Sequence, residues 1–267
     1  MSFQRTYAIV LRVFYLMRGS FTRVFPLFAW SAIDIILWGF ITRYLNSVAQ
    51  SNFNFVSTLL GAVLMWDFFT RVMYGVTTSF FEDVWARNFL NIFASPLKIP
   101  EYLTGLVLAS ILTSAFGLVI MVLIATFLFG LSLFSYGILL IPFILVLFLF
   151  GIALGIVAIS VVLRLGPAAE WFVWPIPSVL APLAAVFYPV ATLPSWLQPL
   201  ARLLPPSYVF EGMRAVVAGH SEPIGLLLIG GAIAVADIFL ASWLFKAMFS
   251  HAVRTGLIAR YSAESTT

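Results

Sequence analysis

The segment PIPSVLAPLAAVFYPVATLPSWLQPLARLLPP, residues 175–206, contains eight of the fourteen prolines of this 267-residue chain. Between its prolines the segment is as apolar as a membrane span. Each proline removes a backbone N–H donor and clashes with a helix in progress, so a continuous lipid-facing helix is not expected here. Broken backbone at membrane depth is tolerated only where protein or a water-filled cavity surrounds it. The segment therefore predicts a pathway or a gate.

The composition of the whole chain is that of an integral membrane protein. Hydrophobic residues make up 63% of it and charged residues 9%, and its mean hydropathy is +1.09. Soluble domains contain about a quarter charged residues, so this chain has more apolar surface than a soluble fold could bury. Because it has no cysteine, disulfides, thiolate metal sites and cysteine nucleophiles are excluded.

Five further stretches reach the roughly 20 apolar residues that a span needs. They are residues 24–44, 54–80, 102–128, 137–163 and 224–248. The proline-rich region supplies a sixth crossing over residues 168–190, after which residues 193–214 form a re-entrant pair of short helices that returns to the same side. We therefore expect an all-α integral membrane fold with six transmembrane helices in one membrane domain, residues 24–250.

The distribution of Arg and Lys orients this predicted fold. The face rich in Arg and Lys carries ten of them: Arg5, Arg12, Arg18, Arg23, Arg87, Lys98, Arg164, Lys246, Arg254 and Arg260. The opposite face carries three: Arg43, Arg202 and Arg214. Cytoplasmic loops carry the excess of positive residues. We expect a multi-pass protein of the inner (cytoplasmic) membrane with both termini, including the tail 251–267, in the cytoplasm.

Residues 1–23 have the pattern of an interfacial amphipathic helix. Apolar residues recur at spacings of four and three: Phe3, Tyr7, Val10, Phe14, Met17 and Phe21. Arg5, Arg12 and Arg23 fall on the other side of the same helix, which predicts a helix lying on the inner leaflet. Ile9, Val13 and Leu16 interrupt the polar side. The alternative is a helix that simply continues into the first span.

A second cytoplasmic segment lies between the second and third predicted spans. Glu82 and Asp83 stand where a helix N-terminus favours acidic residues, and Ser95-Pro96 ends the helix. An apolar stripe runs between them: Trp85, Phe89, and Ile92 or Phe93. These features predict a short amphipathic helix over about residues 84–94. A plain loop helix resting on lipid headgroups is the alternative.

Motifs for catalysis are absent from the sequence. Its two lysines, Lys98 and Lys246, do not follow a glycine, so no phosphate-binding loop exists and the chain does not hydrolyse nucleotide by itself. No nucleophile-elbow motif occurs. His220 and His251 lie on opposite sides of the membrane in this topology, so they cannot share a metal. We expect no catalytic residue, no metal site and no nucleic-acid binding.

Four ionisable residues lie inside the predicted spans: Asp34, Asp67, Arg71 and Asp237. Each costs about 2.5 to 3.5 kcal/mol at the bilayer centre, so each should face protein or water. Asp67 and Arg71 stand four apart in the order that favours pairing. Together with Asp34 they predict a polar patch along a substrate route or, alternatively, a structural ion pair. Gly151 and Gly155 predict a small-residue face for helix packing within one subunit.

The order of these features resembles the type 2 permeases of ATP-binding cassette (ABC) exporters over roughly residues 1–250. Five short motifs carry the resemblance: FASPL at 93–97, FYPV at 187–190, LPSWL at 193–197, PPSY at 205–208 and EGMR at 211–214. The resemblance implies a permease half-subunit that forms a homodimer in membrane lipid. It also implies two copies of a separate cytoplasmic ATPase, which bind ATP and Mg.

The resemblance assigns roles to three groups of residues. An ATPase-coupling helix would contain Val84, Trp85, Arg87, Phe89, Ile92 and Phe93. The extracytoplasmic gate would contain Tyr188, Pro189, Pro194, Trp196, Pro205, Tyr208, Glu211 and Arg214. The substrate route would pass Asp34, Asp67, Arg71 and Phe187. Members of this family export drugs, lipids, glycolipids or polysaccharides, and no residue here selects among them.

Two functions of other classes compete with this interpretation. One is a polytopic membrane enzyme acting on a lipid-linked intermediate, which would need convergent acid, base or metal-ligating groups near one interface. The other is a passive channel or structural subunit. A partner ATPase would favour the exporter over both.

Overall fold

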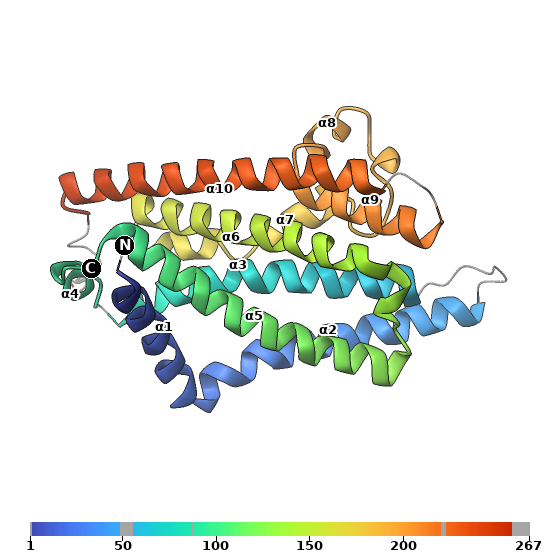
Figure 1. The fold of residues 1–267 in the computed structure, drawn as a ribbon, viewed down its shortest axis with the longest axis horizontal. Helices are drawn as coiled ribbons and strands as arrows, with labels where there is room; N and C mark the ends of the chain where they lie inside the picture. Colours follow the sequence, from blue (N-terminus) through green and yellow to red (C-terminus); the bar gives the residue numbers. More distant parts are fainter. Residues whose placement is uncertain (1, 49–55, 87, 220–222, 258–267) are drawn as a thin grey trace.

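The computed structural model describes residues 2–48, 56–86, 88–219 and 223–257, and this part of the chain contains helices and no strand. Long helices run side by side along the long axis of the molecule (Figure 1). The first half contains α1 (Phe3–Arg18), α2 (Phe21–Val48), η1 (Val56–Leu60), α3 (Gly61–Trp85), α4 (Phe89–Ala94) and α5 (Ile99–Phe129). The second half contains η2 (Leu133–Leu139), α6 (Leu140–Leu165), η3 (Pro167–Phe172), α7 (Ile176–Leu183), η4 (Val190–Thr192), α8 (Gln198–Ala201), α9 (Pro205–Val217) and α10 (Pro223–Arg254).

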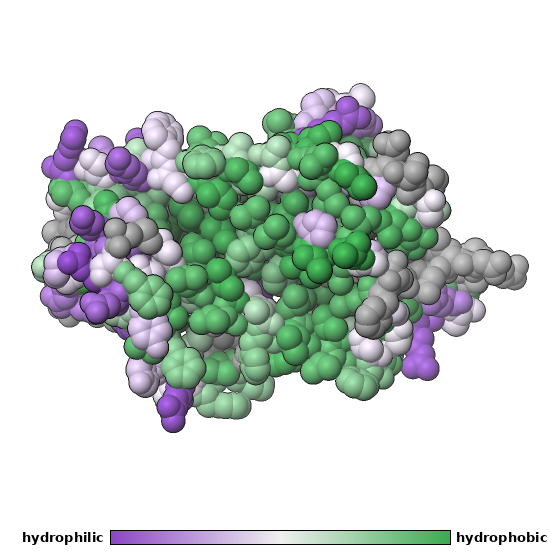
Figure 2. Space-filling model, in the orientation of Figure 1, coloured by the Kyte–Doolittle hydropathy of each residue, from purple (hydrophilic) through white to green (hydrophobic). Residues whose placement is uncertain are grey.

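Four helices in the described residues are long and apolar enough to cross a membrane. They are Thr58–Trp85, Ile99–Phe129, Tyr136–Leu165 and Pro223–Arg254. On the face that Figure 2 shows, apolar side chains cover the middle of the molecule, and hydrophilic residues gather toward its ends. The all-helical membrane fold is therefore confirmed. The count of six crossings stays a prediction, with α2 and the proline-rich segment as the two further crossings.

Prolines divide the segment after α6 into short helices, as their chemistry requires. A proline stands within the first two positions of each of η3, α7, α8 and α9. The backbone N–H that proline lacks would have no hydrogen-bond partner within the helix at these positions. Inside α7, Pro182 is followed by the end of the helix at Leu183. The chain turns at Ala185, which is buried and has a φ of 51°. The segment thus travels the length of the bundle in broken pieces, the backbone that its prolines predict.

The centre of the bundle is α6, which packs against α3 and α10. A Cβ added to Gly151 would lie 3.0 Å from Cβ of Val72, and one added to Gly155 would lie 2.9 Å from Cβ of Val76. Both glycines therefore let α6 approach α3 closely. The small-residue face packs within this chain, as predicted.

The two ends of the bundle carry different elements. The start of α1, the short helix α4 and the last turns of α10 lie at one end, while α8 and the start of α9 lie at the other (Figure 1). The two termini of the helical bundle therefore share an end with α4. The proline-rich hairpin lies at the opposite end.

Candidate functional site

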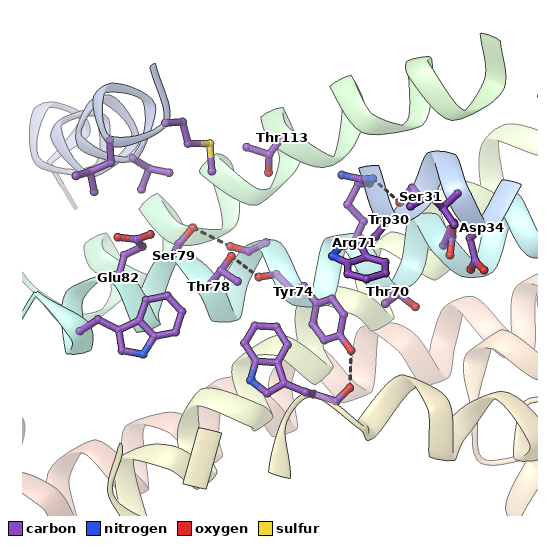
Figure 3. A pocket seen from close by; sticks show the side chains of 18 of the residues that line it. Trp30, Ser31, Asp34, Thr70, Arg71, Tyr74, Thr78, Ser79, Glu82 and Thr113 are labelled. Carbon is purple, nitrogen blue, oxygen red and sulfur yellow. Dashed lines mark hydrogen bonds between the residues drawn. The ribbon is translucent and has the colours of Figure 1, made fainter. Parts of the chain in front are cut away.

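A cavity of about 800 Å³ lies between α1, α2, α3 and α5. Figure 3 shows polar side chains of α3 along one wall, with Asp34 and Ser31 of α2 at one end and Glu82 at the other. Its polar lining consists of Arg12, Ser31, Asp34, Asp67, Thr70, Arg71, Tyr74, Thr78, Ser79, Glu82 and Thr113. Its aromatic lining adds Trp30, Trp85 and Trp174. The last of these comes from the broken segment after η3.

Arg71 lies at the centre of the ionisable cluster in this cavity. Its Nη2 donates a hydrogen bond to Oγ of Ser31 on α2 at 2.5 Å. A Cβ added to Gly117 of α5 would lie 2.5 Å from Nε of Arg71, so this glycine leaves the space that the guanidinium group occupies. Asp67 interacts electrostatically with both Arg71 and Asp34. The structure thus brings together three of the four residues predicted for the substrate route.

The remaining predicted route residue lies elsewhere. Phe187 stacks on Trp38 of α2 with ring centroids 4.9 Å apart, and it does not line the cavity. The aromatic ring packs α2 against the proline-rich segment instead. Asp237 of α10, the fourth ionisable residue of the predicted spans, is also absent from the cavity lining. It therefore belongs to a different environment from that of Asp34 and Asp67.

Most hydroxyl groups of the cavity bond to the protein backbone. The hydroxyl of Thr78 donates to the carbonyl of Tyr74 at 2.6 Å, and that of Ser79 donates to the carbonyl of Gly75 at 2.7 Å. The Tyr74 hydroxyl donates across the cavity wall to the carbonyl of Trp174 at 2.5 Å. This bond joins α3 to the proline-rich segment. Polar residues at helical spacing along α3, from Asp67 to Glu82, are the sequence signal that would have predicted this wall.

One buried ion pair connects α1 to α3 at the α4 end of the cavity. Arg12 forms a salt bridge with Asp83, whose side chain is fully buried. The Tyr102 hydroxyl of α5 donates to Oδ2 of Asp83 at 2.7 Å. Burial lowers the pKa of the Arg12 guanidinium, but the hydrogen bond and charge of Asp83 outweigh burial, so the pKa is raised overall. Three helices therefore meet at one buried carboxylate.

A second connection joins α1 to the start of α5. Glu101 accepts hydrogen bonds from the backbone N–H groups of Ser2 at 2.6 Å and Lys98 at 3.0 Å. Nη1 of Arg5 lies 3.6 Å from Oε2 of Glu101 and donates to the carbonyl of Pro96 at 2.5 Å. The N-terminal helix is thus attached to the chain both before and after α4. The sequence did not predict these attachments.

The predicted coupling helix, residues 84–94, is divided in the structure. Val84 and Trp85 are the last residues of α3, while α4 contains six residues, Phe89–Ala94. Val84 and Ile92 are buried, so they pack into the core rather than form an exposed face. Nε1 of the half-exposed Trp85 donates to Glu170 at 2.8 Å. Arg87 and the side chains of Phe89 and Phe93 lie outside the described residues.

Two predicted gate residues of α9 attach the proline-rich turn to the bundle. Glu211 accepts a hydrogen bond from the backbone N–H of Val190 at 2.6 Å. Arg214 lies 3.3 Å from Glu211 and donates to the carbonyl of Val186 at 3.2 Å. Burial lowers the pKa of the Arg214 guanidinium, and the charge of Glu211 opposes this shift. These residues therefore fasten the turn, a structural task at the predicted gate.

The other predicted gate residues form the hairpin itself. The Tyr188 hydroxyl donates to the carbonyl of Pro182 at 2.7 Å, and the Tyr208 hydroxyl donates to the carbonyl of Arg202 at 2.9 Å. Pro189 precedes η4, Pro194 begins the turn before α8, Trp196 is exposed and Pro205 begins α9. The hairpin has a small core of its own, formed by Ala185, Val190, Leu193 and Ala201.

No group of three or more His, Cys, Asp or Glu that could hold a metal occurs in the described residues. The polar and aromatic lining of the cavity consists of carboxyl, guanidinium, hydroxyl and aromatic groups.

A family model described as ABC-2 type transporter matches residues 7–218, which is well over half of the chain. The search of curated proteins found no match to this chain. The matched residues include most of α1, the cavity, α4 and the proline-rich hairpin.

Proposed function

This chain belongs to the ABC-2 type transporter family, and from that premise we propose that it is the permease half-subunit of an ABC exporter. It moves a hydrophobic or amphipathic substrate out of the cytoplasm or the inner leaflet. A separate cytoplasmic ATPase binds ATP and Mg and drives the movement. The functional unit contains two copies of this chain and two of the ATPase.

The observation that carries this proposal is the cavity of about 800 Å³, lined in part by α3 and α5, two of the helices long and apolar enough to cross a membrane. Pockets for drug-sized ligands measure about 300 to 1,000 Å³ and combine apolar walls with a few polar groups. The cavity has this character, since aromatic and aliphatic side chains surround the Asp34–Asp67–Arg71 cluster. Ionisable residues inside a membrane protein commonly line a substrate route. An amphipathic substrate fits such a lining.

The contacts around α4 suggest how the ATPase could act on the cavity. Because α4 lies directly between α3 and α5 in the chain, a displacement of α4 pulls on both helices. The same displacement reaches α1 through Asp83 and Glu101. Three of the four helices around the cavity therefore respond together, as in a rigid-body transition. In this proposal α4 faces the cytoplasm and binds the ATPase.

The proline-rich hairpin is the outer gate in this proposal. It lies at the end of the bundle opposite α4 (Figure 1). Its crossing is joined to α3 by two hydrogen bonds, from Tyr74 to Trp174 and from Trp85 to Glu170. A movement of α3 can therefore reach the segment that leads to the hairpin. In this proposal the chain crosses the membrane six times, with both termini in the cytoplasm.

Transport in inside-out vesicles tests the proposal. Vesicles containing this chain and its ATPase are given three fluorescent probes on one dansyl-alkyl scaffold, ending in a primary amine, its N-acetyl amide or a carboxylate. We expect ATP-dependent uptake of at least one probe. Phe93→Asp on α4 should abolish coupling, while Asn91→Asp, an exposed position on the same helix, should not. Absence of ATP-dependent uptake for all three probes would remove the exporter assignment.

A further inference from the structure

The cavity contains more acidic than basic groups. Three carboxyl groups line it, on Asp34, Asp67 and Glu82, together with the guanidinium groups of Arg12 and Arg71. Arg12 is already bound to Asp83 behind the wall. Among the described residues, four carboxyl groups thus surround two guanidinium groups. An excess of negative charge at membrane depth is costly unless a cation or a proton balances it.

The hydrogen-bonding capacity of the cavity is also unequal. The donors whose partners the structure shows point at protein acceptors: Arg71 at Ser31, Tyr74 at Trp174 and Trp85 at Glu170. The hydroxyl groups of Thr78, Ser79 and Thr113 donate to backbone carbonyls of their own helices. A hydroxyl has a single hydrogen, so these groups offer the cavity only lone pairs. Along this part of α3 and α5 the lining therefore presents hydrogen-bond acceptors to the cavity.

The carboxyl groups occupy both ends of an elongated space. Asp67 and Glu82 are separated by four turns of α3, roughly 22 Å at the helical rise of about 1.5 Å per residue. Figure 3 shows Glu82 at one end and Asp34 beside Arg71 at the other. Because Glu82 is nearer to α4, it lies at the proposed cytoplasmic end. A positively charged group that enters at this end meets Glu82 first and the Asp34–Asp67 pair deeper in the membrane.

The remaining walls suit an apolar body attached to such a charge. The indole rings of Trp30, Trp85 and Trp174 line the cavity, and an aromatic face attracts a cation within about 6 Å of the ring centroid. Leu16 and Met17 of α1 and Ile33 of α2 add aliphatic surface. The flexible side chain of methionine adapts to ligands of different shape. The site combines acceptors and aromatic rings with apolar walls.

We infer that this cavity binds an amphipathic organic cation, with an amine that donates its N–H groups to the Asp34–Asp67 pair and an apolar body against Trp30, Ile33 and α1. The inference rests on the proposed transport function and specifies its substrate class. An organic amine brings a positive charge to a lining with three carboxyl and two guanidinium groups, and it brings N–H donors for the carboxyl and hydroxyl oxygens.

Binding of the three dansyl-alkyl probes tests this inference on the complete permease–ATPase complex in nanodiscs. We expect the amine to bind about tenfold or more tightly than its N-acetyl amide, since a hydrogen bond to a charged group is lost. The carboxylate probe should bind still more weakly. Asp34→Asn and Asp67→Asn should each weaken binding of the amine about tenfold and leave the N-acetyl amide unchanged.

Asp237→Asn is the matched control, because this acid lies in α10 outside the cavity lining. It should leave binding of all three probes unchanged. If the Asp34 and Asp67 variants unfold, the comparison of amine, amide and carboxylate on the unsubstituted protein decides, because it needs no variant. Equal binding of amine and amide, or tighter binding of the carboxylate, overturns the inference. If the inference is overturned in this way but the vesicles still take up the amide or the carboxylate with ATP, the exporter assignment stands.

Discussion

The two ends of the helical bundle are held together by different forces. At the α4 end, charged side chains connect helices that are far apart in the sequence, as Arg12 does with Asp83 and Ser2 does with Glu101. At the hairpin end, short-range hydrogen bonds to backbone groups dominate, such as those from Tyr188 to Pro182 and from Tyr208 to Arg202. The first end joins separate helices, and the second closes a local turn.

This difference bears on how the proposed exporter moves. A buried ion pair is stable only while both partners stay in place, so it ties α1 to α3 as one body. The hairpin has its own small core and is attached to α9 through Glu211 and Arg214. It can therefore shift as a compact unit. In the proposed exporter, the rigid α4 end suits the side that binds the ATPase. The locally closed hairpin end suits the outer gate.

The largest expected effect comes from breaking the Arg12–Asp83 pair. Arg12→Ala leaves the fully buried Asp83 carboxylate without its cation, and such a loss costs about 3 to 5 kcal/mol. The free energy of unfolding, measured by SDS titration in mixed micelles, should fall by this amount. Arg18→Ala is the control, because Arg18 is exposed in the last turn of the same helix. It should unfold like the wild type.

A double variant shows whether charge causes this loss. Adding Asp83→Asn to Arg12→Ala removes the stranded charge and retains an acceptor for the Tyr102 hydroxyl. It should recover much of the lost stability, as a double-mutant cycle measures. A double variant no more stable than Arg12→Ala would mean that packing, rather than the ion pair, holds α1 at this end.

A smaller effect is expected where α1 packs on α5. A Cβ at Gly105 would lie 2.6 Å from Cβ of Ile9, so Gly105→Ala must displace α1. Overpacking of this kind costs about 1 to 3 kcal/mol, and the same SDS titration measures it. Gly225→Ala, where nothing lies within 4 Å, is the control and should not destabilise the protein.

The hairpin end should respond locally. Glu211→Ala removes the acceptor for Val190 and the partner of Arg214. We expect a loss of about 1 kcal/mol, because the Glu211 side chain is 31% exposed. Hydrogen exchange at residues 186–193 should accelerate while exchange at residues 96–106 stays unchanged. Faster exchange at both ends would contradict the idea that the hairpin is a separate unit.

The sequence predicted the broken backbone of the hairpin because proline acts locally. It also predicted that Asp34, Asp67 and Arg71 share a site, since intramembrane charges need partners. The partners themselves were not predictable: Gly117 and Ser31 come from other helices, and a spacing rule covers one helix only. The same limit applies to Phe187, which packs on Trp38.

Tertiary contacts also explain two differences between the sequence predictions and the structure at the α4 end. Ile9 and Val13 interrupt the polar side of α1 because they are buried, whereas Phe3 and Phe14 are 82% and 55% exposed. The face of α1 that packs on the protein therefore includes Arg12. Asp83 looked like the start of a cytoplasmic helix, but Arg12 compensates its charge inside α3, so α3 continues to Trp85. A local signal for a helix start was overridden by a partner 71 positions earlier, from residue 12 to residue 83.

The smallest expected effect separates two hydroxyl groups of the hairpin. Tyr208→Phe removes a hydrogen bond to the carbonyl of Arg202 in an exposed position, where water replaces it, so the change should be below about 0.5 kcal/mol. Ser207→Ala removes a hydroxyl that is buried and donates to Ala201 at 2.7 Å. That variant should lose about 1 kcal/mol in the same SDS titration. The two residues are neighbours, so equal losses of stability would show that burial of the hydroxyl does not determine its contribution. They would also mean that water reaches the buried Ser207 hydroxyl as readily as the exposed Tyr208 hydroxyl.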